Sequence, residues 1–280
     1  MKRERLTITL RTDLLKTLDS LIDGQRLRNR SHAIEYFLSK SLAEKDSKVL
    51  ILAGGNPVFF KSEGRSLPKA MVSISGKPLL EHTLLRLKEA KLTDVVISVG
   101  EGGEIIRDYF KDGSKWSVNI SYLEQSKSVK GTAQALAQAK ELMKDSHFLL
   151  LYGDVLSEIN FMDFYQFHKA QQLTVCTMAL SSAETVSMWG LAKMQGSKIV
   201  NFEEKPEKPK TFSHLVNAGM YFMKPAIFNY ITPTAVKLES DVFPRLAEEG
   251  RLSGYAYEGM WLDISSESAY QQATKRTKKN

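Results

Sequence analysis

Apolar runs of the length of buried strands recur along most of this 280-residue sequence. They lie at residues 48–53, 94–99, 118–123 and 148–152. Segments with the spacing of amphipathic helices stand between them, at residues 78–90, 104–110 and 131–143. Strands that are apolar on both faces and alternate with helices are typical of α/β proteins with a parallel sheet. We therefore predict a Rossmann-like, mixed but mainly parallel sheet for residues 49–280.

The first 45 residues follow a different pattern, and residues 46–48 are predicted to be a hinge. Residues 5–11 alternate strictly, so that Leu6, Ile8 and Leu10 share one face of a predicted strand. Amphipathic helices are predicted at residues 12–24 and 31–44, with Thr12 and Ser31 as their N-caps. One strand and two helices cannot bury their apolar faces alone. We therefore expect a homodimer in which two chains pair their strands.

This pattern of one strand and two helices resembles the Arc/MetJ family of ribbon-helix-helix repressors over residues 2–44. The resemblance implies DNA as a partner, with the polar face of the paired strands in the major groove and the start of the second helix on a phosphate. The residues that it assigns to DNA are Arg5, Thr7, Thr9, Asn29, Arg30 and Ser31. The alternative is an ordinary edge strand and a helical hairpin joined to the larger domain.

The composition indicates the cellular compartment of the protein but does not indicate its function. Cys176 is the single cysteine, so a disulfide within the chain is excluded and a reduced, cytoplasmic protein is expected. No apolar stretch approaches the length that a bilayer requires, and we expect no membrane partner. The net charge of +7 is compatible with nucleic acid or with anionic substrates and does not choose between them.

The predicted α/β domain carries a series of short motifs in a fixed order. They are Leu52-Ala-Gly-Gly55, Pro68-Lys-Ala-Met71, Gly131-Thr-Ala133, Tyr152-Gly-Asp154, Trp189-Gly190, Phe202-Glu-Glu-Lys-Pro206, Val216-Asn-Ala-Gly219 and Gly259-Met-Trp-Leu-Asp-Ile264. Each motif is weak alone, because glycine pairs and Gly-Asp steps are common in turns. Together, in this order and spacing, they resemble the nucleoside-diphosphate-sugar pyrophosphorylase family over residues 48–273.

The resemblance implies a glycosyltransferase-A-like nucleotidyltransferase fold and the transfer of a nucleotidyl group from an NTP to a sugar 1-phosphate, with release of pyrophosphate. Such a reaction depends on charge neutralisation, which implies Mg²⁺ held by Asp154 and Asp263 and a catalytic role for both and for Lys69. The implied nucleotide-binding residues are Leu52, Ala53, Gly54, Gly55, Gly131 and Thr132. The implied sugar-phosphate-binding residues are Gly190, Glu204, Lys205 and Asn217.

One loop departs from the family pattern. Residues 56–65 keep the expected length, but Pro57 replaces a glycine and Phe59 replaces an arginine. Proline removes a backbone donor and phenylalanine removes a positive charge, so slow turnover is expected unless Lys61 or Arg65 compensates. Two functions remain open: a DNA-binding nucleotidyltransferase that regulates sugar-nucleotide genes, or a transcription regulator whose α/β domain only senses a nucleotide or nucleotide-sugar. The base, the sugar and the assembly of dimers into tetramers are also left open.

Overall fold

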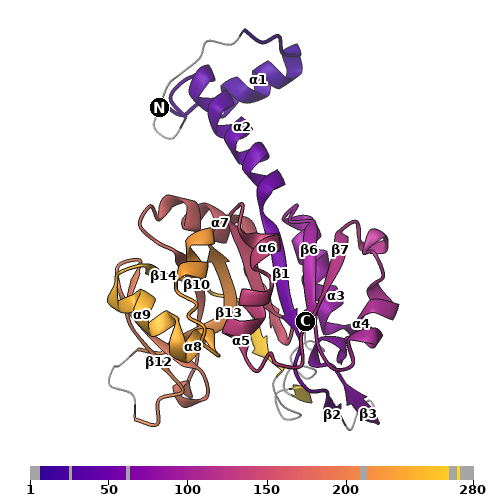
Figure 1. The fold of residues 1–280 in the computed structure, drawn as a ribbon. Helices are drawn as coiled ribbons and strands as arrows, with labels where there is room; N and C mark the ends of the chain where they lie inside the picture. Colours follow the sequence, from indigo (N-terminus) through magenta and orange to yellow (C-terminus); the bar gives the residue numbers. More distant parts are fainter. Residues whose placement is uncertain (1–6, 25–26, 61–63, 209–212, 265–269, 272–280) are drawn as a thin grey trace. The chain divides into compact units, whose positions relative to one another are not determined.

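The chain divides into two compact units, Met1–Asp46 and Ser47–Asn280. The computed structural model describes residues 7–24, 27–60, 64–208, 213–264 and 270–271 (Figure 1). In these ranges every helix is too short or too polar to cross a membrane.

The smaller unit contains helix α1 (Thr12–Ser20) and helix α2 (Arg30–Asp46). The strand predicted at residues 5–11 is absent from Thr7–Arg11, and Arg5 and Leu6 lie outside the described residues. The prediction was wrong for the single chain because a strand must pair its backbone groups with a partner, and the expected partner was a second chain.

Both predicted N-caps of the smaller unit are also corrected. Thr12 is the first residue of α1, and the preceding Arg11 makes no capping hydrogen bond through its side chain. Asn29 caps α2, because its Oδ1 accepts the backbone N–H of His32 at 2.9 Å, while Ser31 is already inside the helix. Arg30 forms a bidentate ion pair with Asp19 of α1, with both N···O distances at 2.7 Å. The side chains of Asn29 and Arg30 therefore have partners within their own unit.

The smaller unit leaves most of its apolar side chains in contact with solvent. Among its described side chains only Leu27 and Ala33 are buried hydrophobics. The exposed ones are Ile8, Leu10, Leu14, Leu21, Phe37 and Leu38.

The larger unit is built on a nine-stranded sheet with the strand order β10-β14-β12-β11-β13-β8-β1-β6-β7. Its strands are β1 (Lys48–Ala53), β6 (Asp94–Val99), β7 (Asn119–Glu124), β8 (Phe148–Tyr152), β10 (Cys176–Ser182), β11 (Gly190–Gln195), β12 (Lys198–Glu204), β13 (Leu215–Met223) and β14 (Leu252–Ala256). Short two-stranded pairs are formed by β2 (Val58–Phe60) with β3 (Arg65–Leu67), β4 (Ser73–Ile74) with β5 (Lys77–Pro78), and β9 (Val155–Ser157) with β15 (Trp261–Asp263).

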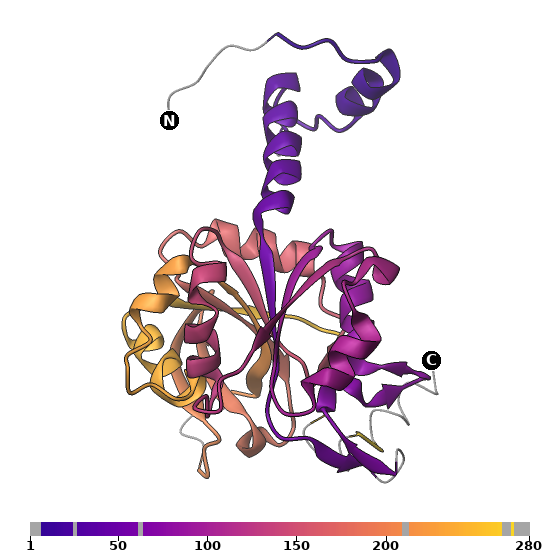
Figure 2. The ribbon, with the colours of Figure 1, turned by 45° about the vertical axis from the view of Figure 1, so that its right-hand side comes forward.

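Helices lie on both sides of this sheet (Figure 2). They are α3 (Leu79–Glu89), α4 (Gly103–Phe110), α5 (Thr132–Gln138), α6 (Lys140–Met143), α7 (Phe161–Ala170), α8 (Leu238–Asp241) and α9 (Phe243–Glu248). Short 3-10 helices are η1 (Lys69–Met71), η2 (Ser114–Trp116), η3 (Val186–Met188) and η4 (Pro225–Asn229). The helix predicted at residues 131–143 is divided into α5 and α6 at Ala139.

The sheet is mixed, as predicted, but only one half of it is parallel. Strands β7, β6, β1 and β8 run parallel to one another. Most pairings in the other half are antiparallel, because β11 and β12 form a hairpin and β13 runs against β8, β10 and β11. The prediction of a mainly parallel sheet missed this hairpin, since only Gly196 and Ser197 connect its strands and a connection so short forces antiparallel pairing.

Strand β13 shows how the core is packed on both faces. Successive side chains of a strand point to opposite faces. The Tyr221 ring lies 5.0 Å from Phe243 of α9, and the next ring, Phe222, lies 5.0 Å from Phe164 of α7. All four rings are fully buried. A strand enclosed in this way is mostly apolar, and Asn217 is the polar exception within Leu215–Met223.

Candidate functional site

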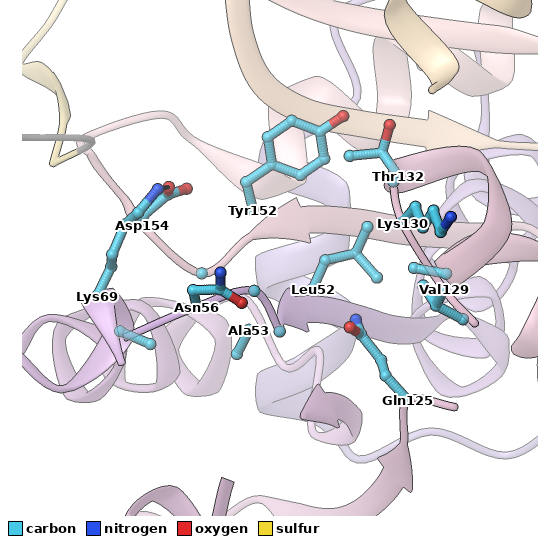
Figure 3. Close-up of a pocket in the computed structure, with 16 residues that line it drawn as sticks. Leu52, Ala53, Asn56, Lys69, Gln125, Val129, Lys130, Thr132, Tyr152 and Asp154 are labelled. Atoms are coloured by element: carbon cyan, nitrogen blue, oxygen red, sulfur yellow. Dashed lines mark hydrogen bonds and ion pairs between the residues drawn. The ribbon is translucent and has the colours of Figure 1, made fainter. Parts of the chain in front are cut away.

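The carboxyl ends of the central parallel strands β1 and β8 open into the larger of two adjoining cavities, with a volume of about 620 Å³ (Figure 3). Adjacent parallel strands end at the same edge of a sheet, and ligands of α/β proteins bind there. The cavity is lined by all the predicted nucleotide-binding residues and by Lys69 and Asp154. They are joined by Asn56, Ala70, Gln125, Val129, Lys130, Ala135, Tyr152 and Gly153.

Small residues and backbone form much of the wall of this nucleotide-sized cavity. Gly55 has φ of +102°, which a residue with a side chain rarely adopts. A Cβ on Gly54 would lie 2.1 Å from Oε1 of Gln125, and a Cβ on Gly131 would lie 2.5 Å from the carbonyl oxygen of Val236. The glycines of both motifs therefore stand where no larger side chain fits without displacing a neighbour.

Lys69 and Asp154 form an ion pair at the edge of the cavity. Lys69 is the first residue of η1, and its Nζ lies 2.9 Å from Oδ2 of Asp154, which follows β8 (Figure 3). The side chains are 32% and 25% exposed, so the pair is open to a ligand from the cavity. It places one positive and one negative charge at the edge of the cavity.

A second cavity, of about 180 Å³, adjoins the first and shares Tyr152 and Asp154 with it. It is lined by all four predicted sugar-phosphate residues and by Asp263. The remaining lining residues are Val155, Met188, Trp189, Ala218, Gly219, Glu239 and Trp261. Residues from β11, β12, β13 and β15, far apart in the sequence, thus meet beside Asp154.

Asp263 reaches this cavity through the pairing of β15 with β9. Asp263 is the register partner of Val155, and the N–H of Ile264 donates to the carbonyl oxygen of Asp154 at 2.8 Å. The indole N–H of Trp189 donates to Oδ2 of Asp263 at 2.9 Å, which fixes the carboxylate. The structure therefore brings the two predicted metal-binding carboxylates to one cavity.

The donor chemistry fits Mg²⁺, which proteins commonly hold by one or two carboxylates together with phosphate oxygens. Among the described residues no group of three or more histidine, cysteine, aspartate or glutamate side chains could hold a metal by itself. A magnesium ion at Asp154 and Asp263 would thus take its remaining ligands from the substrates and from water.

Glu204 is the most constrained of the sugar-side carboxylates. A Cβ on Gly190 would lie 2.2 Å from Cζ of Phe202 and 2.8 Å from Oε2 of Glu204, so the glycine lets the carboxylate enter the cavity. Oε2 is buried and, within the described part of the chain, accepts no hydrogen bond. Burial, and next the Glu239 carboxylate, raise the pKa of Glu204 above its ordinary value of 4.5. An oxygen in this state is suited to accept a hydrogen bond from a ligand hydroxyl.

Lys205 and Asn217 flank Glu204 from two different strands. Lys205 follows β12 directly, is exposed, and has φ of +46°. Asn217 is held by its Oδ1, which accepts the N–H of Gly219 at 3.0 Å and the hydroxyl of Tyr221 at 2.9 Å. One cationic and one amide side chain therefore face the same small cavity.

The hydrogen bonds that Gln125, Tyr152 and Glu239 make in the site were not predicted from the sequence. Gln125 follows β7, and its Nε2 donates to Oγ of Ser98 at 3.1 Å. Glu239, on α8, accepts hydrogen bonds from the hydroxyls of Thr132 and Tyr152. Gln125 could have been predicted from its place at the end of a parallel strand. Nothing in the local sequence around Glu239 or Tyr152 indicates that these two side chains form a hydrogen bond.

The loop that departs from the family pattern contains an antiparallel strand pair. Strand β2 pairs with β3, with Phe60 opposite Arg65. Asn56 lines the larger cavity, whereas Pro57 is not among its lining residues and has its Cγ 3.3 Å from the position of a Cβ on Gly102. Lys61 and the side chains of Phe59 and Arg65 lie outside the described parts of the structure. The lysines that line the cavity are Lys69 and Lys130.

Fold and cavities together define an α/β protein with two adjoining ligand sites at the carboxyl edge of its sheet. The family model described as "Nucleotidyl transferase" matches residues 48–280, and the chain belongs to this family.

The chain is similar to curated members that act on mannose 1-phosphate by name. It is 31% identical over 231 residues to the "Mannose-1-phosphate guanyltransferase" of Schizosaccharomyces pombe, covering 81% of this chain and 63% of that protein. It is 32% identical over 222 residues to the "Mannose-1-phosphate guanylyltransferase catalytic subunit beta" of Danio rerio, covering 78% of this chain and 61% of that protein. The chain thus spans less than two thirds of the length of these relatives.

Solved structures share the fold at lower sequence identity. A UDP-glucose pyrophosphorylase complexed with UDP-glucose superposes with a TM-score of 0.70 at 22% identity, covering 83% of this chain and 98% of that chain. HddC from Yersinia pseudotuberculosis superposes with a TM-score of 0.68 at 21% identity, covering 82% of this chain and 99% of that chain. The larger unit therefore has the mixed α/β fold of these proteins.

Proposed function

We propose that the protein transfers a guanylyl group from GTP to mannose 1-phosphate and releases pyrophosphate. The observation that carries the proposal is the meeting of two cavities at Asp154, one large enough for a nucleotide and one smaller and lined by charged side chains. The names of the relatives support guanine as the base and mannose as the sugar.

The proposed reaction needs little proton transfer and much charge neutralisation. An oxygen of the sugar phosphate forms a bond to the α-phosphorus of the nucleotide. The bond from that phosphorus to the bridging oxygen breaks, and its electron pair leaves with pyrophosphate. Fixed positive charges that face the developing negative charge lower the barrier of such a step. The site must therefore hold two phosphate groups together and neutralise both.

The residues of the first cavity suit a triphosphate. Backbone N–H groups near Gly54 and Gly55 can approach phosphate oxygens, because no side chain stands between. Lys69 would turn from Asp154 to the phosphates, and Lys130 lies across the same cavity. A magnesium ion bound by Asp154 and Asp263 would neutralise phosphate charge at the boundary of the two cavities.

The residues of the second cavity suit a sugar phosphate. Glu204 would accept a hydrogen bond from a sugar hydroxyl, and Asn217 would contact a second hydroxyl. Lys205 would pair with the phosphate. The attacking phosphate and the α-phosphate would then meet near Asp154, which lines both cavities.

The test is pyrophosphate release by the full chain with Mg²⁺, each nucleoside triphosphate and a panel of sugar 1-phosphates. We expect turnover with GTP and mannose 1-phosphate, slow because Pro57 and Phe59 remove a donor and a charge, and lost in Asp154→Asn. Turnover with another pair would reassign the substrates. Nucleotide binding without turnover for any pair would instead favour the sensor, and the transferase proposal would fail.

We propose, as a second function, that the smaller unit forms a ribbon-helix-helix dimer that binds DNA. The supporting observation is that this small unit exposes several apolar side chains, including Ile8, Leu10 and Leu14. Pairing of residues 5–11 between two chains would cover Ile8 and Leu10 and present Arg5, Thr7 and Thr9 to the major groove. Asn29, Arg30 and Ser31, at the start of α2, would contact a phosphate of the DNA.

Arg30 would have to exchange Asp19 for a phosphate in such a complex. The test compares DNA binding by the full chain and by a chain that begins at Lys48, at several salt concentrations. We expect binding by the full chain that weakens steeply as salt rises, and its loss in the shortened chain. Equal binding by both chains would overturn the assignment to the smaller unit.

A further inference from the structure

Glu239 lies between the two cavities and contacts residues of both. The residue is only 9% exposed, sits on α8 and lines the second cavity. Its Oε2 accepts the hydroxyl of Thr132 at 2.7 Å, and its Oε1 accepts the hydroxyl of Tyr152. Figure 3 shows the hydroxyls of Tyr152 and Thr132 on the same side of the cavity, where both donate to the Glu239 carboxylate. One carboxylate of the sugar-phosphate cavity therefore holds two walls of the nucleotide cavity.

The Thr132 wall depends on the segment that carries Glu239. The N–H of Leu238 donates to Oγ1 of Thr132 at 2.8 Å, and the N–H of Ala133 donates to the carbonyl oxygen of Val236 at 3.0 Å. A change in the position of residues 236–239 would thus move the start of α5. That helix start forms one side of the nucleotide cavity.

The Tyr152 wall connects the same carboxylate to the catalytic edge. Tyr152 stands two residues before Asp154 and lines both cavities. Its ring lies 5.5 Å from the ring of Tyr221, whose hydroxyl donates to Asn217. Burial and the Glu239 carboxylate raise the pKa of Tyr152 well above 10.0, so the phenol keeps its proton and stays a donor at neutral pH.

We propose that Glu239 is a positioning residue that couples the two cavities, so that a ligand bound in one strengthens binding in the other. This inference rests on the proposed two-substrate function. A ligand that contacts Thr132 or Tyr152 restricts the carboxylate between them, and the second ligand then has less motion left to remove. By thermodynamic linkage the effect on affinity is the same in both directions.

The test is calorimetric binding of an α,β-methylene analogue of GTP, which cannot react, with and without saturating mannose 1-phosphate. In the unchanged protein we expect the sugar phosphate to tighten binding of the analogue by roughly tenfold. In Glu239→Gln the factor should fall close to one, because the two hydroxyls donate to different carboxylate oxygens and glutamine replaces one of these acceptors with an NH2 donor. A Glu239→Gln protein that keeps the full factor would overturn the proposal.

Glu249→Gln is the matched control, because Glu249 accepts the hydroxyl of Tyr230 at 2.7 Å and lines neither cavity. It should keep the factor of the unchanged protein. Thr132→Val removes only one of the two hydroxyls, and adding it to Glu239→Gln should weaken nucleotide binding by less than the sum of the two single changes.

A second measurement needs no ligand. Amide hydrogen exchange in the peptide that covers residues 131–138 should be faster in Glu239→Gln than in the unchanged protein and in Glu249→Gln. Equal protection in all three would also overturn the positioning role. If the unchanged protein binds neither GTP analogue nor mannose 1-phosphate, the proposed function fails, and the exchange rates still decide the role of Glu239.

Discussion

The two cavities are lined by different kinds of groups. The larger one, about 620 Å³, is walled mainly by backbone and small residues such as Ala53, Gly54 and Gly55. The smaller one, about 180 Å³, is lined by charged and aromatic side chains such as Glu204, Lys205 and Trp261. Backbone N–H groups suit phosphates of any nucleotide, whereas hydroxyls of one sugar require acceptors at fixed places. The comparison indicates that substitutions in the two cavities should affect different substrates.

Lys69 tests the boundary between the cavities and should give the largest effect. Changing Lys69 to alanine removes the cation that is 2.9 Å from Asp154, and we expect kcat/KM to fall by roughly a hundredfold or more for both substrates. Steady-state kinetics with each substrate varied in turn measures it. Lys77→Ala is the control, because Lys77 forms an ion pair with Glu81 and lines neither cavity. A fall in kcat/KM for one substrate alone would contradict the position of Lys69 at a boundary that both substrates share.

Gly54 tests the backbone wall of the nucleotide cavity. In Gly54→Ala the new Cβ would lie 2.1 Å from Oε1 of Gln125, so the glutamine side chain must move. We expect the KM for the nucleotide to rise by about tenfold, the loss of roughly one hydrogen-bonding contact, with little change in the KM for the sugar phosphate. The double change Gly54→Ala with Gln125→Ala should recover most of the loss. A larger rise in the KM for the sugar phosphate than for the nucleotide would contradict the assignment of the two substrates to separate cavities.

Glu204 tests the side-chain wall and should give the smallest effect, a several-fold rise in the KM for the sugar phosphate in Glu204→Gln. Its raised pKa also sets a pH dependence, since the ionised form that accepts hydroxyls is lost as pH falls through that pKa. The acidic limb of kcat/KM for the sugar phosphate should therefore lie above pH 4.5 and disappear in Glu204→Gln.

The sign for stability is opposite to that for activity. Because the folded state raises the pKa of Glu204, ionisation costs stability as pH rises above the ordinary value of 4.5, and Glu204→Gln should melt no lower than the unchanged protein at pH 7. The neighbouring Glu203→Gln should leave the acidic limb in place, since Glu203 lines neither cavity. An unchanged limb in Glu204→Gln would assign it to another group.

Local pattern was enough to predict the parallel half of the sheet. The strands predicted at residues 48–53, 94–99 and 148–152 are β1, β6 and β8 with the same bounds. Burial on both faces makes such strands continuous apolar runs, which no other element of that length resembles as closely. The strand predicted at residues 5–11 failed in the single chain for the opposite reason, since its pattern depends on a partner chain that the sequence cannot place.

The sequence by itself determined which motifs line the site. Glycines after β1, an aspartate after β8 and the Glu-Lys pair at the end of β12 follow from the resemblance of the motif series to a known family, and the structure places them in two adjoining cavities. The tertiary structure decided which of them touch. Glu239 meets Thr132 across 107 positions of sequence and Tyr152 across 87. Such contacts depend on strand order and on how the helices pack upon the sheet, and neither is encoded in a local pattern.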